Sequence, residues 1–170
     1  SYTSAARVKV TIAFMNGDTV VETRQLNEGA KISAPAVTPA KAEYAGVSFT
    51  FKAWYLADGT KLGTSTKASA DATYYALFTC NGDHDFGCVP KEVDGKTYVP
   101  CKYCDVVEVL AADGTVASTE WRIVEKELPP VPGIIDDCTD LAAPTNASLQ
   151  MINLKKIKNM DQTAPKYITL

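Results

Sequence analysis

The sequence predicts a mainly β protein and leaves a β-rich α+β fold open as the alternative. Apolar and polar residues alternate in several short runs, which is the period of a half-buried strand. Turn dipeptides such as Asn-Gly and Asp-Gly separate these runs, and four of the five cysteines gather with the only histidine between residues 80 and 104. We expect a small β domain at residues 1–79, a Cys/His-stapled β-hairpin module at residues 80–127, and a Pro-rich linker with an extended or short-helical tail at residues 128–170.

The distribution of charge supports these boundaries. Residues 1–79 carry eight Lys/Arg and six Asp/Glu, whereas residues 80–134 carry five and ten. The whole chain has 17 basic and 20 acidic residues and a net charge of -3, so it lacks the basic field that draws proteins to nucleic acid. No apolar run approaches the roughly 20 residues that cross a bilayer. We therefore expect no nucleic-acid partner and no membrane span.

The first segment opens with a predicted hairpin. Arg7 to Phe14 alternates, so its apolar side chains face one side of a strand. Asn16-Gly17-Asp18 supplies residues that tolerate the positive φ of a tight turn, and Thr19 to Arg24 can then return antiparallel. Lys31 to Ala42 contains two prolines that oppose a continuous helix. We expect an extended connection or one short helical turn there.

Two further strands complete the predicted first domain. Val47 to Tyr55 is rich in aromatic and β-branched residues, which favours a core strand. We expect Trp54 to fill the core rather than to bind a ligand at the surface. Asp58-Gly59 supplies the next turn. Thr73 to Phe78 alternates again, with one face formed by Tyr74, Ala76 and Phe78.

The motifs of the first segment resemble those of a known family. The sequence Val-Thr-Ile-Ala-Phe is followed by Asn16-Gly17, by Gly29 and Pro35, by Phe51-Lys-Ala-Trp-Tyr and by Asp71-Ala-Thr-Tyr-Tyr-Ala-Leu-Phe. Over about residues 7 to 79 the chain resembles the Listeria-Bacteroides repeat, also called the internalin B-repeat. Ala53 departs from the pattern, since the family usually has glycine there. The resemblance implies a β-grasp-like module of bacterial surface and secreted proteins, usually found in arrays that extend or present other domains.

The cysteines and the histidine of the second segment have the spacing of metal ligands. A Cys-x2-Cys turn places two sulfurs on one side of a tight loop, and a knuckle about twenty residues earlier can complete a tetrahedron around zinc. Asp94-Gly95 predicts a hairpin between Val89 to Val93 and Lys96 to Val99, as in a zinc ribbon. The segment also resembles a Cys/His-rich stretch of gut-bacterial surface proteins. Its pattern is Cys80-x3-His84-x3-Cys88-x12-Cys101-x2-Cys104.

Two ligand sets and one metal-free arrangement stay open. The first set leaves Cys88 and Cys138 free to form a disulfide, and it comprises Cys80, His84, Cys101 and Cys104. The second set replaces His84 by Cys88 and makes the histidine a surface residue. Disulfides without a metal are the third arrangement, because a secreted chain favours disulfides whereas a reducing cytoplasm favours zinc.

A last hairpin is predicted after the cluster, and the tail is ambiguous. Val106 to Leu110 and Val116 to Val124 flank the turn Ala112-Asp113-Gly114, and we expect Trp121 and Ile123 to pack. In the tail, Ala147 to Met160 fits either a short helix or an alternating strand.

We predict no catalytic residue and no enzymatic activity. A redox-active CxxC usually opens a helix that lowers the pKa of its thiol, whereas a strand is expected after Cys104. Asp83 and Asp85 are interpreted as solvated turn residues rather than as a general base for a hydrolytic metal. The only histidine already belongs to the cluster, so no Ser-His-Asp set is available.

The leading functional hypothesis is a non-catalytic structural or adhesive module of a bacterial surface or secreted protein, acting as a spacer or as a protein- or glycan-binding unit. The alternative is a self-assembling structural subunit of an extracellular filament or a phage particle. Its terminal segments would pair with neighbouring copies by strand addition to a sheet edge. The expected partners are therefore other protein chains, including copies of itself, with glycans as an option. The expected location is extracellular or at the bacterial surface, with a virion or cytoplasmic assembly as the alternative.

Overall fold

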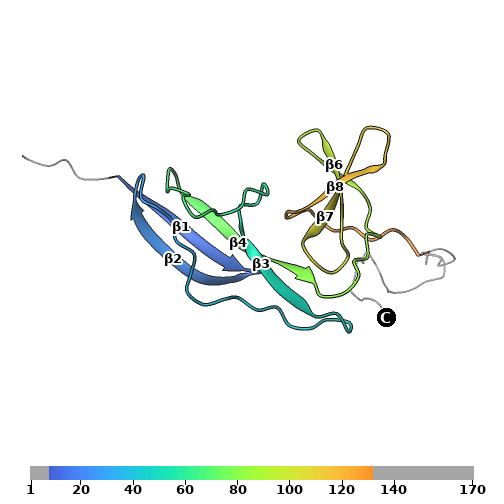
Figure 1. Cartoon of the computed structure of the whole chain (residues 1–170), viewed down its shortest axis with the longest axis horizontal. Coiled ribbons are helices and arrows are strands. Elements are labelled where there is room, and N and C mark those ends of the chain that lie inside the picture. The colour runs from blue at the N-terminus through green and yellow to red at the C-terminus, as the bar shows by residue number, and fades with distance from the viewer. Residues whose placement is uncertain (1–7, 132–170) are drawn as a thin grey trace, which may run out of the picture. The chain divides into compact units, whose positions relative to one another are not determined.

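The computed structural model describes residues 8–131, and it confirms the mainly β class. These residues form two four-stranded sheets and contain no helix (Figure 1). The first sheet consists of β1 (Lys9–Asn16), β2 (Thr19–Asn27), β3 (Phe49–Tyr55) and β4 (Ala72–Cys80). The second consists of β5 (Lys91–Val93), β6 (Lys96–Pro100), β7 (Val106–Leu110) and β8 (Val116–Trp121).

The first sheet has the strand order β2-β1-β4-β3, and its two central strands run parallel. β1 and β2 form the predicted hairpin, with Gly17 at a φ of 60° in its turn. β3 and β4 pair antiparallel, and the register shifts between Phe51 and Ala53, where a bulge interrupts the ladder. The parallel pair at its centre makes this a mixed sheet, and no helix packs on it within residues 8–131. The connection from β2 to β3 contains no helical turn, so only the extended option of that expectation holds.

Alternation along the strands builds the core on one face of this sheet. Ile12 and Phe14 are fully buried, and Trp54 is 4% exposed, which confirms its predicted place in the core. The Phe14 ring meets Trp54 edge-on, with 5.1 Å between ring centroids, and it stacks on Tyr74 at 5.8 Å. Such aromatic contacts add to the free energy gained by removing apolar area from water. The core cluster also includes Val10, Ile32, Ala68, Ala76 and Phe78.

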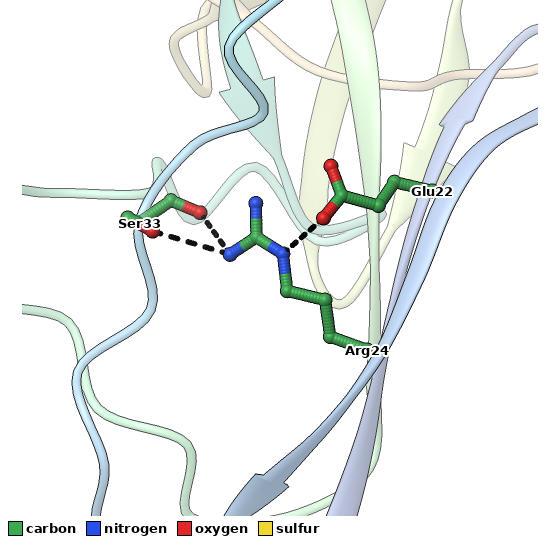
Figure 2. Close-up of polar contacts among 3 residues, drawn as sticks. All are labelled: Glu22, Arg24 and Ser33. Atoms are coloured by element: carbon green, nitrogen blue, oxygen red, sulfur yellow. Dashed lines mark hydrogen bonds and ion pairs between the residues drawn. The ribbon is translucent and has the colours of Figure 1, made fainter.

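The guanidinium of Arg24 fixes the start of the long connection after β2. Its Nη1 donates to the backbone carbonyl of Ser33 at 2.5 Å, and its Nε donates to the carboxylate of Glu22 at 2.5 Å (Figure 2). The same guanidinium lies over the Phe14 ring, 4.9 Å from its centroid. One side chain therefore joins the connection, the outer strand of the sheet and the core.

The second sheet has the order β5-β6-β7-β8, and all its neighbouring strands are antiparallel. Both predicted hairpins of this segment are present, and Asp94-Gly95 forms the first turn with φ values of 51° and 82°. Trp121 packs as predicted, but Ile123 is 41% exposed. β8 ends at Trp121, so the alternation expected for residues 116–124 does not continue and Val124 is buried instead.

The described strands all lie within one compact unit that ends at Pro129. The boundary predicted at residue 80 falls at the last residue of β4, between the two sheets. Predictions for the chain ends lie outside the described residues, and these include strand addition by the termini, Cys138 and residues 147–160. Within residues 8–131 the structure has no helix that could span a membrane.

Ala45 provides a test of the backbone between β2 and β3. It has a φ of 52° and lies beside Gly46, which has a φ of 78°, in a turn closed by hydrogen bonds between Tyr44 and Val47. A left-handed conformation costs an ordinary residue about 1–2 kcal/mol, and asparagine tolerates it. We expect Ala45→Asn to raise the free energy of urea unfolding by about 1 kcal/mol. Ala57→Asn is the control, since Ala57 lies in an exposed turn without positive φ; equal effects of the two substitutions would contradict the prediction.

Candidate metal centre

Four candidate ligands come together where the two sheets meet. Cys80 is the last residue of β4, Cys101 directly follows β6, and Cys104 lies two residues before β7. His84 belongs to the segment that leaves β4. Their ligand atoms, three Sγ and one imidazole nitrogen, all lie within 4.8 Å of one another. The structure thus assembles the first of the two predicted ligand sets, from parts of the chain that belong to different sheets.

The distances between these atoms suit a tetrahedral ion better than a disulfide. The Sγ atoms of Cys80 and Cys101 are 3.8 Å apart, and Cys104 Sγ is 3.4 Å from His84 Nδ1. A tetrahedral ion bound at about 2.3 Å to sulfur and about 2.1 Å to nitrogen separates two sulfurs by about 3.8 Å and sulfur from nitrogen by about 3.6 Å. A disulfide needs about 2.05 Å. The four cysteines in the described residues are all free thiols.

The Cys-x2-Cys loop, residues 101–104, has the backbone geometry that a metal site requires. We call this loop the knuckle. The amide of Tyr103 donates to Cys101 Sγ at 3.4 Å. The amide of Cys101 donates to the carbonyl of Val106 at 2.9 Å, which joins the end of β6 to the start of β7. Because β6 and β7 are antiparallel neighbours, a short loop between them turns both cysteine side chains the same way. The strand predicted after Cys104 is present, so no helix terminus acts on these thiols.

Burial and proximity make the three thiols resist joint ionisation. Burial raises the pKa of Cys80 to about 12, and the neighbouring Cys104 and Cys101 thiols contribute. Burial raises the pKa of Cys104 as well. Burial also acts to raise the pKa of Cys101, but backbone amides, first that of Tyr103, donate to its sulfur and lower the pKa to about 6. Three thiolates this close need a compensating cation. A divalent metal supplies that charge.

An apolar shell separates the cluster from water on most sides. Cys101 and Cys104 are fully buried, and Cys80 is 6% exposed. Val106 is buried with them, and the side chains packed around this group are Val47, Phe49, Phe86, Tyr103 and Trp121. His84 is the most exposed of the four candidate ligands, and its ring lies 5.4 Å from that of Phe86. The imidazole therefore forms the solvent side of the centre.

Asp105 ties the knuckle to the first sheet by a reciprocal pair of hydrogen bonds. Its carboxylate accepts from the amide of Phe78 at 2.8 Å, and its own amide donates to the carbonyl of Phe78 at 3.0 Å. Its carbonyl accepts from the amide of Arg122 at 3.1 Å. Burial raises the pKa of Asp105, and the hydrogen bond from Phe78 opposes this shift. These bonds keep Asp105, and with it the neighbouring Cys104, next to the end of β4.

The other predicted site residues lie outside the group of four. Cys88 is buried, at 5% exposure, but it does not belong to the cluster of candidate ligands. Its predicted disulfide partner, Cys138, lies outside the described residues. Asp85 accepts from the amide of Gly87 at 2.9 Å and, through its carbonyl, from the amide of Lys102 at 2.7 Å. These contacts are those of a turn residue that shapes the loop after His84.

Two lysines that no sequence pattern marks contact the knuckle. Lys126 Nζ donates to the carbonyls of Cys101 at 2.5 Å and Cys104 at 2.6 Å. Lys41 Nζ donates to the carbonyl of Tyr103 at 2.9 Å. Both lysines lie in segments without regular secondary structure, 62 residues before the knuckle in one case and 22 after it in the other. No periodic signal marks such contacts, since they depend on how the connections cross the sheets.

Comparisons with protein-family models and with curated proteins give no significant match to this chain. The similarity of residues 7–79 to the internalin B-repeat therefore remains a prediction from the motifs.

Asp105 allows the hydrogen bonds between the end of β4 and the β6–β7 loop to be tested. We call this contact the junction. Asp105→Ala leaves the buried amide of Phe78 without a partner, and we expect it to lower the free energy of unfolding by about 1–3 kcal/mol. Asp105→Asn keeps an acceptor and removes the charge that burial disfavours, so we expect a stability equal to or above that of the parent. Urea unfolding followed by tryptophan fluorescence measures both. Equal losses for the two variants would show that the negative charge, and not the acceptor, is what matters.

Proposed function

We propose that residues 8–131 form a non-catalytic structural module in which a zinc ion, bound by Cys80, His84, Cys101 and Cys104, fixes the second sheet to the end of the first. The observation that carries this proposal is the closeness of four candidate ligand atoms, within 4.8 Å of one another, drawn from both sheets. Zinc is the metal most compatible with three thiolates and one imidazole in a tetrahedral arrangement.

A structural role is favoured by the completeness of the ligand set. Catalytic zinc sites usually have three protein ligands and leave one position to water or substrate, whereas structural sites have four protein ligands. Here four candidate ligands are available for the tetrahedron, and three of them are buried cysteines. Bound metal would then contribute directly to folding, as in small domains whose cores need support.

The biological setting of the proposal rests on the resemblance of the first segment. Internalin B-repeat-like modules imply a bacterial surface or secreted protein, in which such a module acts as a spacer or as a unit that binds a protein or a glycan. A metal-fixed junction suits a spacer because it limits bending between two small sheets. The resemblance supports an extracellular location, and the ligand geometry supports a metal rather than a disulfide at this junction.

Metal analysis of the purified full chain tests the centre. We expect about one equivalent of zinc per chain, and we expect Cys101→Ser to lose most of it because a tetrahedral structural site needs all four ligands. Cys88→Ser is the matched control, since it removes a buried cysteine outside the group of four and should retain the metal. Zinc below about 0.2 equivalents together with the absence of free thiols would overturn the proposal in favour of disulfides.

Removal of the metal should also reduce stability. A ligand that binds only the folded state at about 1,000 times its Kd contributes about 4 kcal/mol. We therefore expect a strong chelator to lower the Tm of the parent chain and of Cys88→Ser, and to leave that of Cys101→Ser nearly unchanged. Differential scanning calorimetry with and without the chelator measures this effect. Equal shifts in Cys101→Ser and the parent would show that the chelator acts elsewhere.

A further inference from the structure

The ammonium group of Lys126 lies at the backbone of two candidate metal ligands. It donates to the carbonyls of Cys101 and Cys104, at 2.5 Å and 2.6 Å, and so it spans the Cys-x2-Cys loop. The carbonyl of Tyr103, between them, accepts from Lys41, whose ammonium also lies 4.2 Å above the Phe49 ring. Ammonium groups therefore bind three backbone carbonyls of one loop, although the two lysines come from segments far apart in the sequence.

Ion pairing with a carboxylate does not account for the position of Lys126. In the part of the chain that the structure describes, its ammonium forms no salt bridge, while Lys91 in the same region pairs with Glu127 at 2.5 Å. The charge of Lys126 acts on the nearby carboxylate of Asp105, yet that carboxylate accepts its hydrogen bond from the amide of Phe78. The loop carbonyls are the direct partners of this ammonium group.

Charge balance supplies the reason for a cation at this place. Three thiolates and a neutral imidazole around a divalent ion leave one net negative charge in a mostly buried centre. An uncompensated charge away from water is costly, and a nearby ammonium group offsets it. Hydrogen bonds to the backbone of ligand residues also fix the orientation of those ligands.

We propose that Lys126 is a positioning residue and the counter-charge of the metal centre, so that metal affinity depends on the docking of residues 122–127 against the Cys-x2-Cys loop. This inference rests on the proposed zinc site. The docked segment has other attachments: the amide of Val89 donates to the carbonyl of Glu127 at 2.7 Å, and Val124 is buried against Tyr98 and Val107. By linkage, bound metal and the docked segment stabilise each other to the same extent.

Competition with a chromophoric zinc chelator tests the inference on the full chain. Lys126→Met removes the charge and both hydrogen bonds while keeping the aliphatic stem, and we expect it to lower zinc affinity about 10- to 100-fold, as loss of a contact behind the ligands usually does. Lys126→Arg keeps the charge and the donors and should recover most of the affinity. Lys91→Met is the matched control, since it removes a lysine that contacts the same segment but not the knuckle; it should stay within about twofold of the parent.

The cobalt spectrum of each variant separates loss of affinity from loss of the site. We expect the parent and Lys126→Met to show the same tetrahedral thiolate–cobalt bands, because the four ligands are unchanged. A Lys126→Met affinity within about twofold of the parent overturns the inference while leaving the metal site intact. An equal loss in Lys91→Met overturns it too, since general loosening of the segment would then explain the effect. A parent chain that binds no metal instead overturns the proposed function itself.

Discussion

The structure depends most on the contact between the end of β4 and the loop that joins β6 to β7. Cys80 ends one sheet, and Cys101 and Cys104 flank the loop of the other, so three thiols meet at the only place where both sheets offer ligands in the described residues. Without a cation this meeting is unfavourable, because buried thiolates repel one another and thiols satisfy few hydrogen bonds. The proposed metal would turn the same group into a strong attachment between the two sheets.

Hydrogen bonds and cation–π contacts around the cluster also join the two sheets. Asp105 pairs with the backbone of Phe78, and Arg122 donates to the carbonyl of Asp58 at 2.5 Å while its guanidinium lies over the Tyr98 ring. Gly59 suits the turn that presents this carbonyl, since its φ of 91° is one that residues with a side chain rarely adopt. Each such bond contributes on the order of 1 kcal/mol, so together they help to hold one sheet against the other.

The mainly β class, the hairpins and the group of four candidate ligands, as one of two open sets, could be predicted from the sequence because each depends on local signals. Alternation located β1 and β4, Asn16-Gly17 and Asp94-Gly95 located two turns, and the cysteine spacing located the cluster. The contacts that position the cluster could not be predicted. Lys126 and Asp105 look like solvated charges in a sequence, and Ile123 looked like a core residue because nothing in the sequence marks the end of β8 at Trp121. These features depend on long-range packing.

The place of Cys80 at the end of β4 restricts how this sequence can change. Tyr74, Ala76 and Phe78 face the first core, and Cys80 continues the same two-residue period into the group of candidate metal ligands. Insertion or deletion of one residue within β4 would rotate the thiol to the opposite face of the sheet while leaving the strand formed. Length variation in related chains should therefore be confined to the loops, or occur in β4 in steps of two residues. The alternation of side chains along β4 therefore determines both the core of the first sheet and the position of the Cys80 thiol.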